Sequence, residues 1–399
     1  MLANTAHMRN RNNQIALRFV LLLGVVSLFA DMTYEAARSI TGPYLAILGA
    51  SATVVGIVAG LGELIGYGLR IVSGIISDRT HRYWAITIAG YTVNLLAVPA
   101  MALAGRWEIA AVLIMAERFG KAIRTPARDA MLSHAAQGLG RGWAFGIHEA
   151  MDQIGAIIGP IIVAAVLAWK GSYEFGFAGL IVPALLALAV LAVARISYPQ
   201  PHDLEPSSRA PKTIGLRSTF WFYLMAVACI ALGFVDYPLA AFHMKTHAIV
   251  ADKWIPLIYA GAMGVDALSA LAFGRLYDKK GFPVLLVIIA ASAWSAPLVF
   301  LTGPVVLIFG MALWGIGMGA QESIIRAVVA DIVPQDQRAT GYGVFNAGFG
   351  LAWFAGSALM GLLYERSLIG LVTFSVLTQL LALPLLYLVH NRLKQCSLQ

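Results

Sequence analysis

The chain has 399 residues, of which 59% are hydrophobic and only 12% are charged. This composition excludes an ordinary soluble protein of two or three domains and indicates a polytopic membrane protein. The formal net charge of +8 would also suit a nucleic-acid-binding protein, but the distribution of the basic residues indicates membrane topology instead. We therefore expect no nucleic-acid partner, and a lipid bilayer as the surroundings of the chain.

Taken in chain order, twelve stretches are long enough to cross a bilayer as helices. One extended polar linker, 198–217, contains four prolines and mixed charges and divides these spans six and six. We predict an all-α polytopic fold with an N-terminal six-helix bundle, 1–197, and a C-terminal one, 218–399. The twelve spans cover approximately residues 15–46, 53–77, 83–104, 107–127, 142–168, 173–197, 218–243, 253–277, 282–302, 304–330, 338–363 and 367–390.

The lysines and arginines are unequally divided between the two sides of the membrane. With an even number of spans, seventeen of the 28 lie on the side of the N-terminus, and five lie on the other side. Cytoplasmic loops carry such an excess, so both termini are predicted to be cytoplasmic. The first span is too long and too acidic for a cleaved signal peptide. We expect a multi-pass protein of the inner, or plasma, membrane that works as a monomer.

The two halves share a repeated motif. Residues 74–79, Gly-Ile-Ile-Ser-Asp-Arg, recur as residues 274–279, Gly-Arg-Leu-Tyr-Asp-Lys, in the equivalent loop. The segment 74–82 resembles the G-x-L-x-D-R-x-G-R-[KR] signature of the major facilitator superfamily, with His81 where glycine is usual. The resemblance covers essentially the whole chain. It implies a secondary transporter that works by alternating access, with its substrate site between two halves of six helices.

Two further motifs of that family match in part. In span four, Arg118 stands where the family has the arginine of R-x-x-Q-G, while Lys121 and Ala122 replace the glutamine and glycine. In span five, residues 155–160 resemble the G-x-x-x-G-P motif of proton-coupled exporters, without the glycine pair that follows it. The resemblance implies proton coupling and leaves import and export open.

The loop motif also has a direct physical interpretation. Asp78, at a helix end, could accept hydrogen bonds from the first amides of a helix of the opposite half near Thr340. Arg79 and Arg82 could pair with Asp129, which would close the cytoplasmic side. The alternative is that these charges only follow the membrane topology and cap helices. The predicted gate residues are Gly74, Asp78, Arg79, Arg82, Arg128, Asp129 and Asp278.

Span four carries an unusual stretch of charge. At 100° per residue, Glu117, Lys121, Arg124 and Arg128 fall on one stripe of the helix. A charge in lipid costs about 3 kcal/mol on insertion scales. The stripe is therefore expected to face a watery cavity or fixed counter-charges.

Carboxyl groups in the first two spans are candidates for proton coupling. Asp31 and Glu35 lie one turn apart in span one, and Glu63 lies near the middle of span two. Two carboxyl groups so close in an apolar medium readily take up a proton. The alternative is a static Glu35–Arg38 ion pair, with Asp31 bonded to polar neighbours.

Other polar side chains within the spans are expected to line a substrate cavity. Arg118 is the foremost of them, because its guanidinium can grip a carboxylate or phosphate with two hydrogen bonds. The buried cations slightly favour an organic anion as the substrate, whereas the buried acids favour export of cationic or amphipathic compounds. The predicted cavity residues are Tyr34, Arg38, Tyr67, Arg70, Glu117, Arg118, Lys121, Glu149, Asp236, Tyr237, Asp266, Trp314, Gln321, Glu322 and Asn346.

Motifs of other function classes are missing from the sequence. It has no G-x-S-x-G elbow, H-E-x-x-H pair or Walker A loop, so we expect neither an enzyme nor an ATP-driven pump. A sensor would need a soluble extension, for which the tails are too short. His243 and His247 have metal-ligand spacing but no third ligand nearby, so no metal and no cofactor is expected. The energy source is then an ion gradient, of protons or of sodium.

Overall fold

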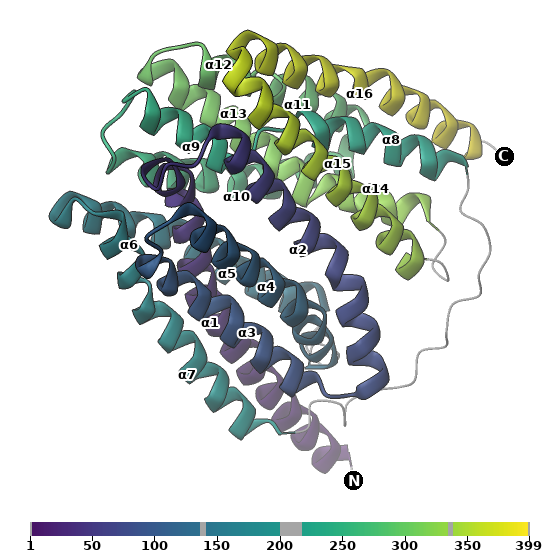
Figure 1. Ribbon diagram of the computed structural model, residues 1–399. Helices are drawn as coiled ribbons and strands as arrows, with labels where there is room; N and C mark the ends of the chain where they lie inside the picture. Colours follow the sequence, from purple (N-terminus) through teal and green to yellow (C-terminus); the bar gives the residue numbers. More distant parts are fainter. Residues whose placement is uncertain (1, 136–140, 200–217, 334–337, 398–399) are drawn as a thin grey trace. The chain divides into compact units, whose positions relative to one another are not determined.

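The computed structural model describes residues 2–135, 141–199, 218–333 and 338–397. Over these residues all regular structure is helical, with no β-strand (Figure 1). The elements are α1 (Leu2–Ile47), α2 (Ala52–Thr80), α3 (Tyr83–Ala100), the short 3₁₀ helix η1 (Met101–Leu103), α4 (Trp107–Ala135), α5 (Arg141–Lys170), α6 (Tyr173–Gly179), α7 (Ile181–Ser197), α8 (Ser218–Gly233), α9 (Tyr237–Thr246), α10 (Trp254–Lys280), α11 (Pro283–Ser292), α12 (Ser295–Phe300), α13 (Pro304–Glu322), α14 (Ile324–Ile332), α15 (Arg338–Arg366) and α16 (Leu368–Ser397).

The predicted all-α membrane fold is confirmed. Eleven of the twelve predicted spans coincide with helices, or pairs of consecutive helices, that are long and apolar enough to cross a bilayer. The twelfth is α4, whose 29 residues are also long enough but include the charged stretch 117–129. Helix α4 thus differs from the other spans in its charge and not in its length. Its ionised side chains therefore need opposite charges or polar groups within the protein.

The helices gather into two compact units. The first unit comprises residues 1–37, 69–104 and 112–209, and the second comprises residues 38–68, 105–111 and 210–399. Each of the long helices α1 and α2 therefore contributes one part to each unit. The division into bundles 1–197 and 218–399 stays a prediction, and nearly all of the predicted linker lies outside the described residues.

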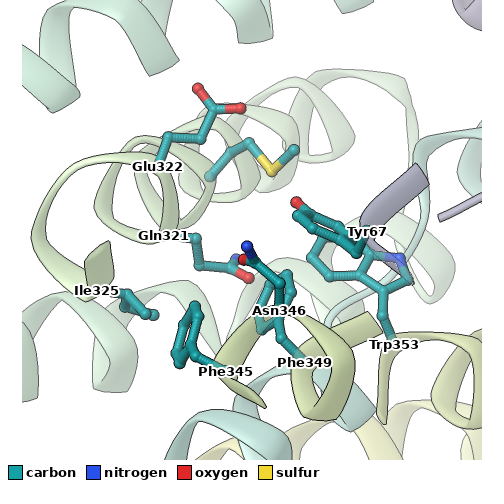
Figure 2. Close-up of a pocket in the computed structure, with 9 residues that line it drawn as sticks. Tyr67, Gln321, Glu322, Ile325, Phe345, Asn346, Phe349 and Trp353 are labelled. Atoms are coloured by element: carbon teal, nitrogen blue, oxygen red, sulfur yellow. The ribbon is translucent and has the colours of Figure 1, made fainter. Parts of the chain in front are cut away.

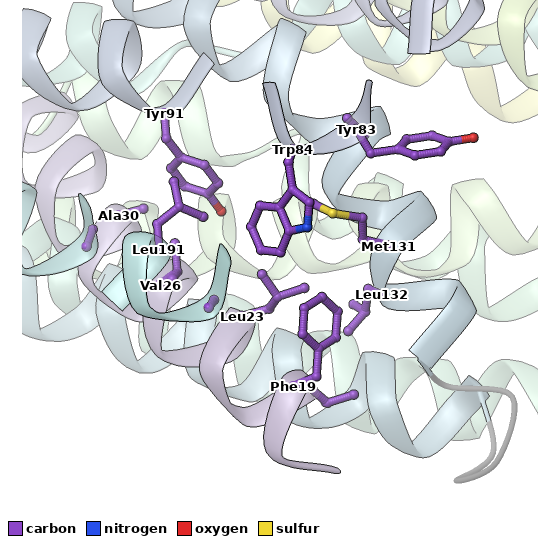
Figure 3. Close-up of a cluster of buried hydrophobic side chains, with 14 of the residues drawn as sticks. Phe19, Leu23, Val26, Ala30, Tyr83, Trp84, Tyr91, Met131, Leu132 and Leu191 are labelled. Atoms are coloured by element: carbon purple, nitrogen blue, oxygen red, sulfur yellow. The ribbon is translucent and has the colours of Figure 1, made fainter. Parts of the chain in front are cut away.

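A buried apolar cluster holds the first unit together (Figure 3). Phe19, Leu23 and Val26 recur on one face of α1 and meet Trp84 of α3 together with residues of α4, α5 and α7. The rings of Phe19 and Trp84 pack edge to face with centroids 6.2 Å apart, a favourable geometry for aromatic pairs. The indole Nε1 of Trp84 donates to the carbonyl oxygen of Tyr198 at 2.9 Å, which anchors the end of α7.

Glycines allow two pairs of helices in this unit to approach closely. A Cβ atom at Gly120 of α4 would lie 2.4 Å from the backbone nitrogen of Asn94 in α3. A Cβ atom at Gly159 of α5 would lie 2.3 Å from the carbonyl oxygen of Met32 in α1, and Gly155 meets Leu28 in the same way. Small residues of this kind let helix backbones touch. The partial G-x-x-x-G-P motif thus brings α5 against the segment of α1 that carries Asp31.

In the second unit, the seventh span is broken into two helices. Helix α8 ends at Gly233 and α9 begins at Tyr237, where Pro238 cannot donate a backbone hydrogen bond. The carbonyl groups freed at the break are satisfied by side chains of other helices. Gln379 Nε2 donates to the Gly233 carbonyl at 3.0 Å, and Trp314 Nε1 donates to the Val235 carbonyl at 2.7 Å.

The first half of α2 packs against α15 within the second unit. A Cβ atom at Gly56 would lie 2.3 Å from the carbonyl oxygen of Ser357, and one at Gly60 would lie 3.0 Å from Cα of Phe354. At the start of α2, the amide of Thr53 donates to the Glu365 carboxylate at 2.9 Å. A carboxylate in this position satisfies an otherwise free amide of the first turn.

Candidate functional site

Charged side chains of α1, α4 and α5 meet inside the first unit. Asp31 and Glu35 lie one turn apart on α1, and Lys121 and Arg124 lie about one turn apart on α4. Asp31, Glu35 and Arg124 are buried, the last to 1% exposure. The cations of α4 therefore lie beside acids of α1, which is how a charged helix is accommodated in a membrane protein.

At one end of this group, Glu117 connects α3 with α4. Its carboxylate Oε1 accepts a hydrogen bond from Asn94 Nδ2 at 2.8 Å, and its Oε2 lies 3.2 Å from Nε of Arg118. The guanidinium predicted to grip a substrate thus has an adjacent counter-charge. Asn94 was not identified from the sequence, because one neutral amide in an apolar helix gives no signal.

The next contact joins α4 to α1 through Lys121. Its Nζ lies 4.0 Å from Glu35 Oε1 and 3.7 Å from the centroid of the Tyr34 ring. An ammonium group at this distance over an aromatic face is attracted by the ring quadrupole. Glu35 therefore lies within ion-pair distance of a cation on another helix, and the alternative of a pair with Arg38 on its own helix stays a prediction.

The contact between Tyr34 and Lys121 can be tested by two substitutions. Tyr34→Leu removes the ring and is expected to lower the free energy of unfolding by about 1–2 kcal/mol. Tyr34→Phe keeps the ring but loses the hydroxyl that hydrogen-bonds Asp31, so it is expected to lose less than Tyr34→Leu, which loses both. The measurement is thermal unfolding of the purified variants in detergent, and equal losses for the two variants would contradict a role for the ring.

Arg124 occupies the centre of the group. Its guanidinium carbon lies 4.2 Å from the centroid of the Tyr91 ring, while Nε and Nη1 have no hydrogen-bond partner among the described residues. The Oδ1 atom of Asp31 is likewise buried without a hydrogen-bond partner. A buried polar atom without a hydrogen-bond partner is usually satisfied by water, by a proton or by a bound ligand. The centre of the group can therefore bind and release one of these three species.

A hydrogen-bonded chain follows toward the N-terminal part of α1. Nε2 of His148 lies 2.9 Å from Ser27 Oγ, and its Nδ1 lies 3.3 Å from Asp152 Oδ2. Ser27 also accepts from Arg128 Nη1 at 3.1 Å. Arg128 in turn donates twice to Asp129 Oδ1, at 2.9 Å and 2.8 Å. Ser27 thus links the ion pair of α4 to the histidine of α5.

From the sequence, Glu149 is the residue of α5 that is expected in the cavity. The side chain of Glu149 is exposed, whereas Asp152 pairs with His148 and its Oδ1 is buried without a hydrogen-bond partner. The spacing of four residues between His148 and Asp152 was the available signal for this pair.

The second unit contains a separate ionic contact around Arg38. Nη2 of Arg38 lies 3.4 Å from Glu63 Oε1 and 3.8 Å from Asp236 Oδ1. The other oxygen of Asp236 accepts a hydrogen bond from Ser357 of α15. Three predicted site residues, from α1, α2 and the break before α9, therefore meet in one buried contact.

Three other predicted cavity residues of this unit are deeply buried. Tyr237 donates to the Ile255 carbonyl at 2.7 Å, and Trp314 makes the bond to Val235 described above, so both stabilise the break in span seven. Asp266 of α10 is 1% exposed and lies against Gly319 of α13. Tyr237 and Trp314 therefore bond neighbouring segments of the same unit, as polar groups in membrane proteins commonly do.

A pocket in the second unit brings together four of the predicted cavity residues (Figure 2). It contains about 340 Å³ of empty space, part of it open to solvent. The four residues are Tyr67 of α2, Gln321 and Glu322 of α13, and Asn346 of α15. Its other lining residues are Met318, Ile325, Phe345, Phe349 and Trp353.

The residues of the predicted gate are only partly placed. Asp78, Arg79 and Arg82 are exposed in the first unit, and a Cβ atom added at Gly74 would lie 3.7 Å from Cβ of Pro126 in α4. Arg70 of α2 is half-buried. The side chain of Asp278 lies outside the described residues. The docking of Asp78 on the opposite half remains a prediction.

Among the described residues, no group of three or more histidine, cysteine, aspartate or glutamate side chains is arranged to hold a metal ion. The paired histidines of α9 bond a tyrosine of α15. His243 Nδ1 lies 2.9 Å from the Tyr364 hydroxyl, which is 3.4 Å from His247 Nε2.

The fold and these buried polar groups define a multi-pass membrane protein of the transporter class. Comparison with known proteins gives the family. The Major Facilitator Superfamily model matches residues 23–357 and again residues 255–392. An uncharacterized protein of Mycobacterium tuberculosis (strain H37Rv) is 44% identical, covering 94% of this chain and 93% of its own. The chain therefore belongs to the major facilitator superfamily, which confirms the resemblance seen in residues 74–82.

Two further similarities agree with this assignment. An uncharacterized MFS-type transporter of Methanocaldococcus jannaschii is 27% identical, covering 90% of this chain and 91% of its own. The crystal structure of a bacterial homologue of the human lysosomal transporter Spinster shares the fold, with a TM-score of 0.74 at 15% identity over 96% of this chain and 98% of that one. The protein is thus a transporter of the plasma membrane and not an enzyme.

Proposed function

We propose that the protein is a secondary transporter that couples the movement of a small organic solute to the movement of protons. The observation that supports this most strongly is a series of buried ionisable side chains that follow one another through the first unit. It runs from Glu35 and Lys121 past Asp31 to Asp152 and His148. Ionisable residues at this depth in a membrane protein commonly serve ion or proton pathways.

Protons fit this site better than sodium ions. A proton on Asp31 or Glu35 removes a negative charge beside Lys121 and Arg124, so these cations have to find other partners. Protonation thereby changes which side chains pair across α1 and α4. A sodium ion at Asp31 would instead be repelled by the two neighbouring cations. Asp152 and His148 extend the proton path toward the predicted cytoplasmic end.

Helix α1 supplies a route from this site to the second unit. Glu35 belongs to the first unit and Arg38, one turn further along the same helix, belongs to the second. A new partner for Glu35 shifts the segment that also carries Arg38, which is paired with Glu63 and Asp236. Glu63 then acts by holding Arg38 and not by carrying the proton.

The solute is proposed to be neutral or cationic. The expectation of an organic anion depended on cations that were free to bind it. Arg118, Lys121 and Arg128 each have a carboxylate within 4.0 Å, and Arg124 is buried to 1% exposure. An anion would therefore have to displace an existing partner or enter a closed part of the protein. A cationic or amphipathic solute, the alternative substrate class, requires no such displacement.

Both termini are proposed to be cytoplasmic, with the loop 74–82 as the gate on that side.

The test uses purified protein in liposomes that contain the pH indicator pyranine. A gradient of ethidium, a flat aromatic cation, is imposed, and benzenesulfonate serves as the anionic probe. Proton movement with ethidium beyond that of protein-free liposomes is expected, with little for benzenesulfonate. Movement that requires sodium, or an absence of proton movement with both probes, would contradict the proposal.

A further inference from the structure

We infer that the pocket of the second unit recognises a flat ring that carries hydrogen-bonding groups on its edge, in a solute without net negative charge. This inference rests on the proposed transport function and specifies its substrate. The evidence is the chemistry of the walls of the pocket, the direction of its polar groups and the charges among its lining residues.

Aromatic rings form one wall of the pocket. Phe349 lies at its centre, with ring centroids 5.2 Å from Tyr67, 5.9 Å from Phe345 and 5.4 Å from Trp353. Phe345 and Phe349 are nearly parallel, 14° apart. Residues of α2 and α15 thus present ring faces and edges to a common space. A planar ring stacks on such a surface whatever its substituents.

Two amides face this aromatic wall. In Figure 2 the amide groups of Gln321 and Asn346 point toward one another, between the rings of Tyr67 and Phe345. Gln321 is 5% exposed, its Nε2 makes a long bond of 3.3 Å to the Gly317 carbonyl, and its Oε1 has no hydrogen-bond partner. A buried amide oxygen of this kind is suited to a donor on a bound solute.

Charge then limits the class of solute. Among the nine described residues that line the pocket, Glu322 is the one ionisable acid and no lysine or arginine occurs. The carboxylate of Glu322 points away from the amide pair in Figure 2. A neutral ring edge therefore meets the amides, a cationic substituent is attracted by Glu322, and an anion meets no compensating charge on these walls.

The test measures binding to the purified protein in detergent with four small probes. Benzamide is neutral, benzamidinium is cationic and benzoate is anionic, while cyclohexanecarboxamide carries the amide of benzamide on a saturated ring. Bound solute raises the melting temperature by mass action. Benzamide and benzamidinium are expected to bind, and the other two probes to bind about tenfold more weakly.

Variants locate the binding in the pocket. Phe349→Leu is expected to weaken binding of benzamide and benzamidinium about tenfold. The matched control is Phe300→Leu, a buried phenylalanine of the same unit that does not line the pocket, and it should leave binding unchanged. Asn346→Leu changes a half-buried side chain, so it tests the site even if Phe349→Leu does not fold. The substitution Asn346→Leu should weaken the binding of benzamide.

Several results would overturn the inference. They are equal binding of benzoate and benzamide, equal binding of the saturated probe, the absence of binding by benzamide and benzamidinium, or the same affinity in Asn346→Leu as in the wild type. Because binding is measured without a gradient, the two proposals fail separately. Normal binding without proton movement in liposomes would contradict the transport mechanism and leave the recognition intact.

Discussion

Replacing Asp31 by asparagine is expected to reduce solute-driven proton movement to the level of protein-free liposomes. Asparagine has nearly the same shape but cannot take up a proton. Among the described residues Oδ1 of Asp31 has no hydrogen-bond partner, and an asparagine oxygen can still accept the hydrogen bond from Tyr34. The helices should therefore stay folded. The measurement is the pyranine signal during an ethidium gradient, together with the melting temperature of the variant.

The control for this experiment is Glu108→Gln, which changes an exposed acid at the start of α4 that pairs with Arg106. This variant should transport as the wild type does. Full proton movement in Asp31→Asn, with the protein folded, would remove Asp31 from the proton pathway. A loss in both variants would indicate a general effect of charge on the reconstituted protein.

The second large effect is expected for Gly159→Ala, which acts through packing. The added Cβ atom would lie 2.3 Å from the Met32 carbonyl oxygen and 2.9 Å from Cα of the same residue. Because these are backbone atoms, α1 and α5 must separate to make room. We expect a loss of about 1–3 kcal/mol in the free energy of unfolding and a weaker proton response, since Asp31 and Asp152 lie on these helices.

Gly146 provides a matched control on α5, because a Cβ atom there would meet no atom within 4 Å. Gly146→Ala is expected to stabilise the helix slightly, as alanine does at open helical positions. The measurement is the melting temperature of each variant in detergent. An equal change in both would show that the close contact between α1 and α5 does not contribute to the stability of the protein.

Most of the fold could be predicted from the sequence, because apolar stretches of membrane length need no knowledge of their neighbours. The break in span seven lies beside Pro238, which cannot donate a backbone hydrogen bond. Helix α4 shows the limit of this reasoning, because its charges give it the composition of a surface helix. Only its counter-charges on α1 and α5 explain why it can be a membrane helix.

The candidate site was predicted less completely. Periodicity identified Asp31, Glu35 and Lys121 as residues on particular helix faces, but it could not show which partners they have. The sequence offered Arg38, three residues away, as a static partner of Glu35, and the structure also brings Lys121 of another helix to Glu35. Ser27 and Tyr91 were missed because a hydroxyl or an aromatic ring in an apolar helix gives no signal of its own.

The pocket illustrates the same limit. Tyr67, Gln321 and Asn346 were each expected in a cavity, but as single polar groups on separate helices. That they meet depends on how α2, α13 and α15 pack, for instance on Gly350, whose Cβ position lies 3.1 Å from Cβ of Tyr67. Contacts of this kind lie far apart in the sequence, and a single sequence does not reveal them.

Infrared difference spectroscopy of the protein in lipid, between about pH 5 and pH 8, tests most directly whether the buried acids of the first unit exchange protons. It needs no substrate. We predict a carboxyl band that appears as the pH falls and is lost in Asp31→Asn, with a second change in Asp152→Asn. A spectrum without such a band, or one that is identical in both variants and the wild type, would contradict proton coupling by this site.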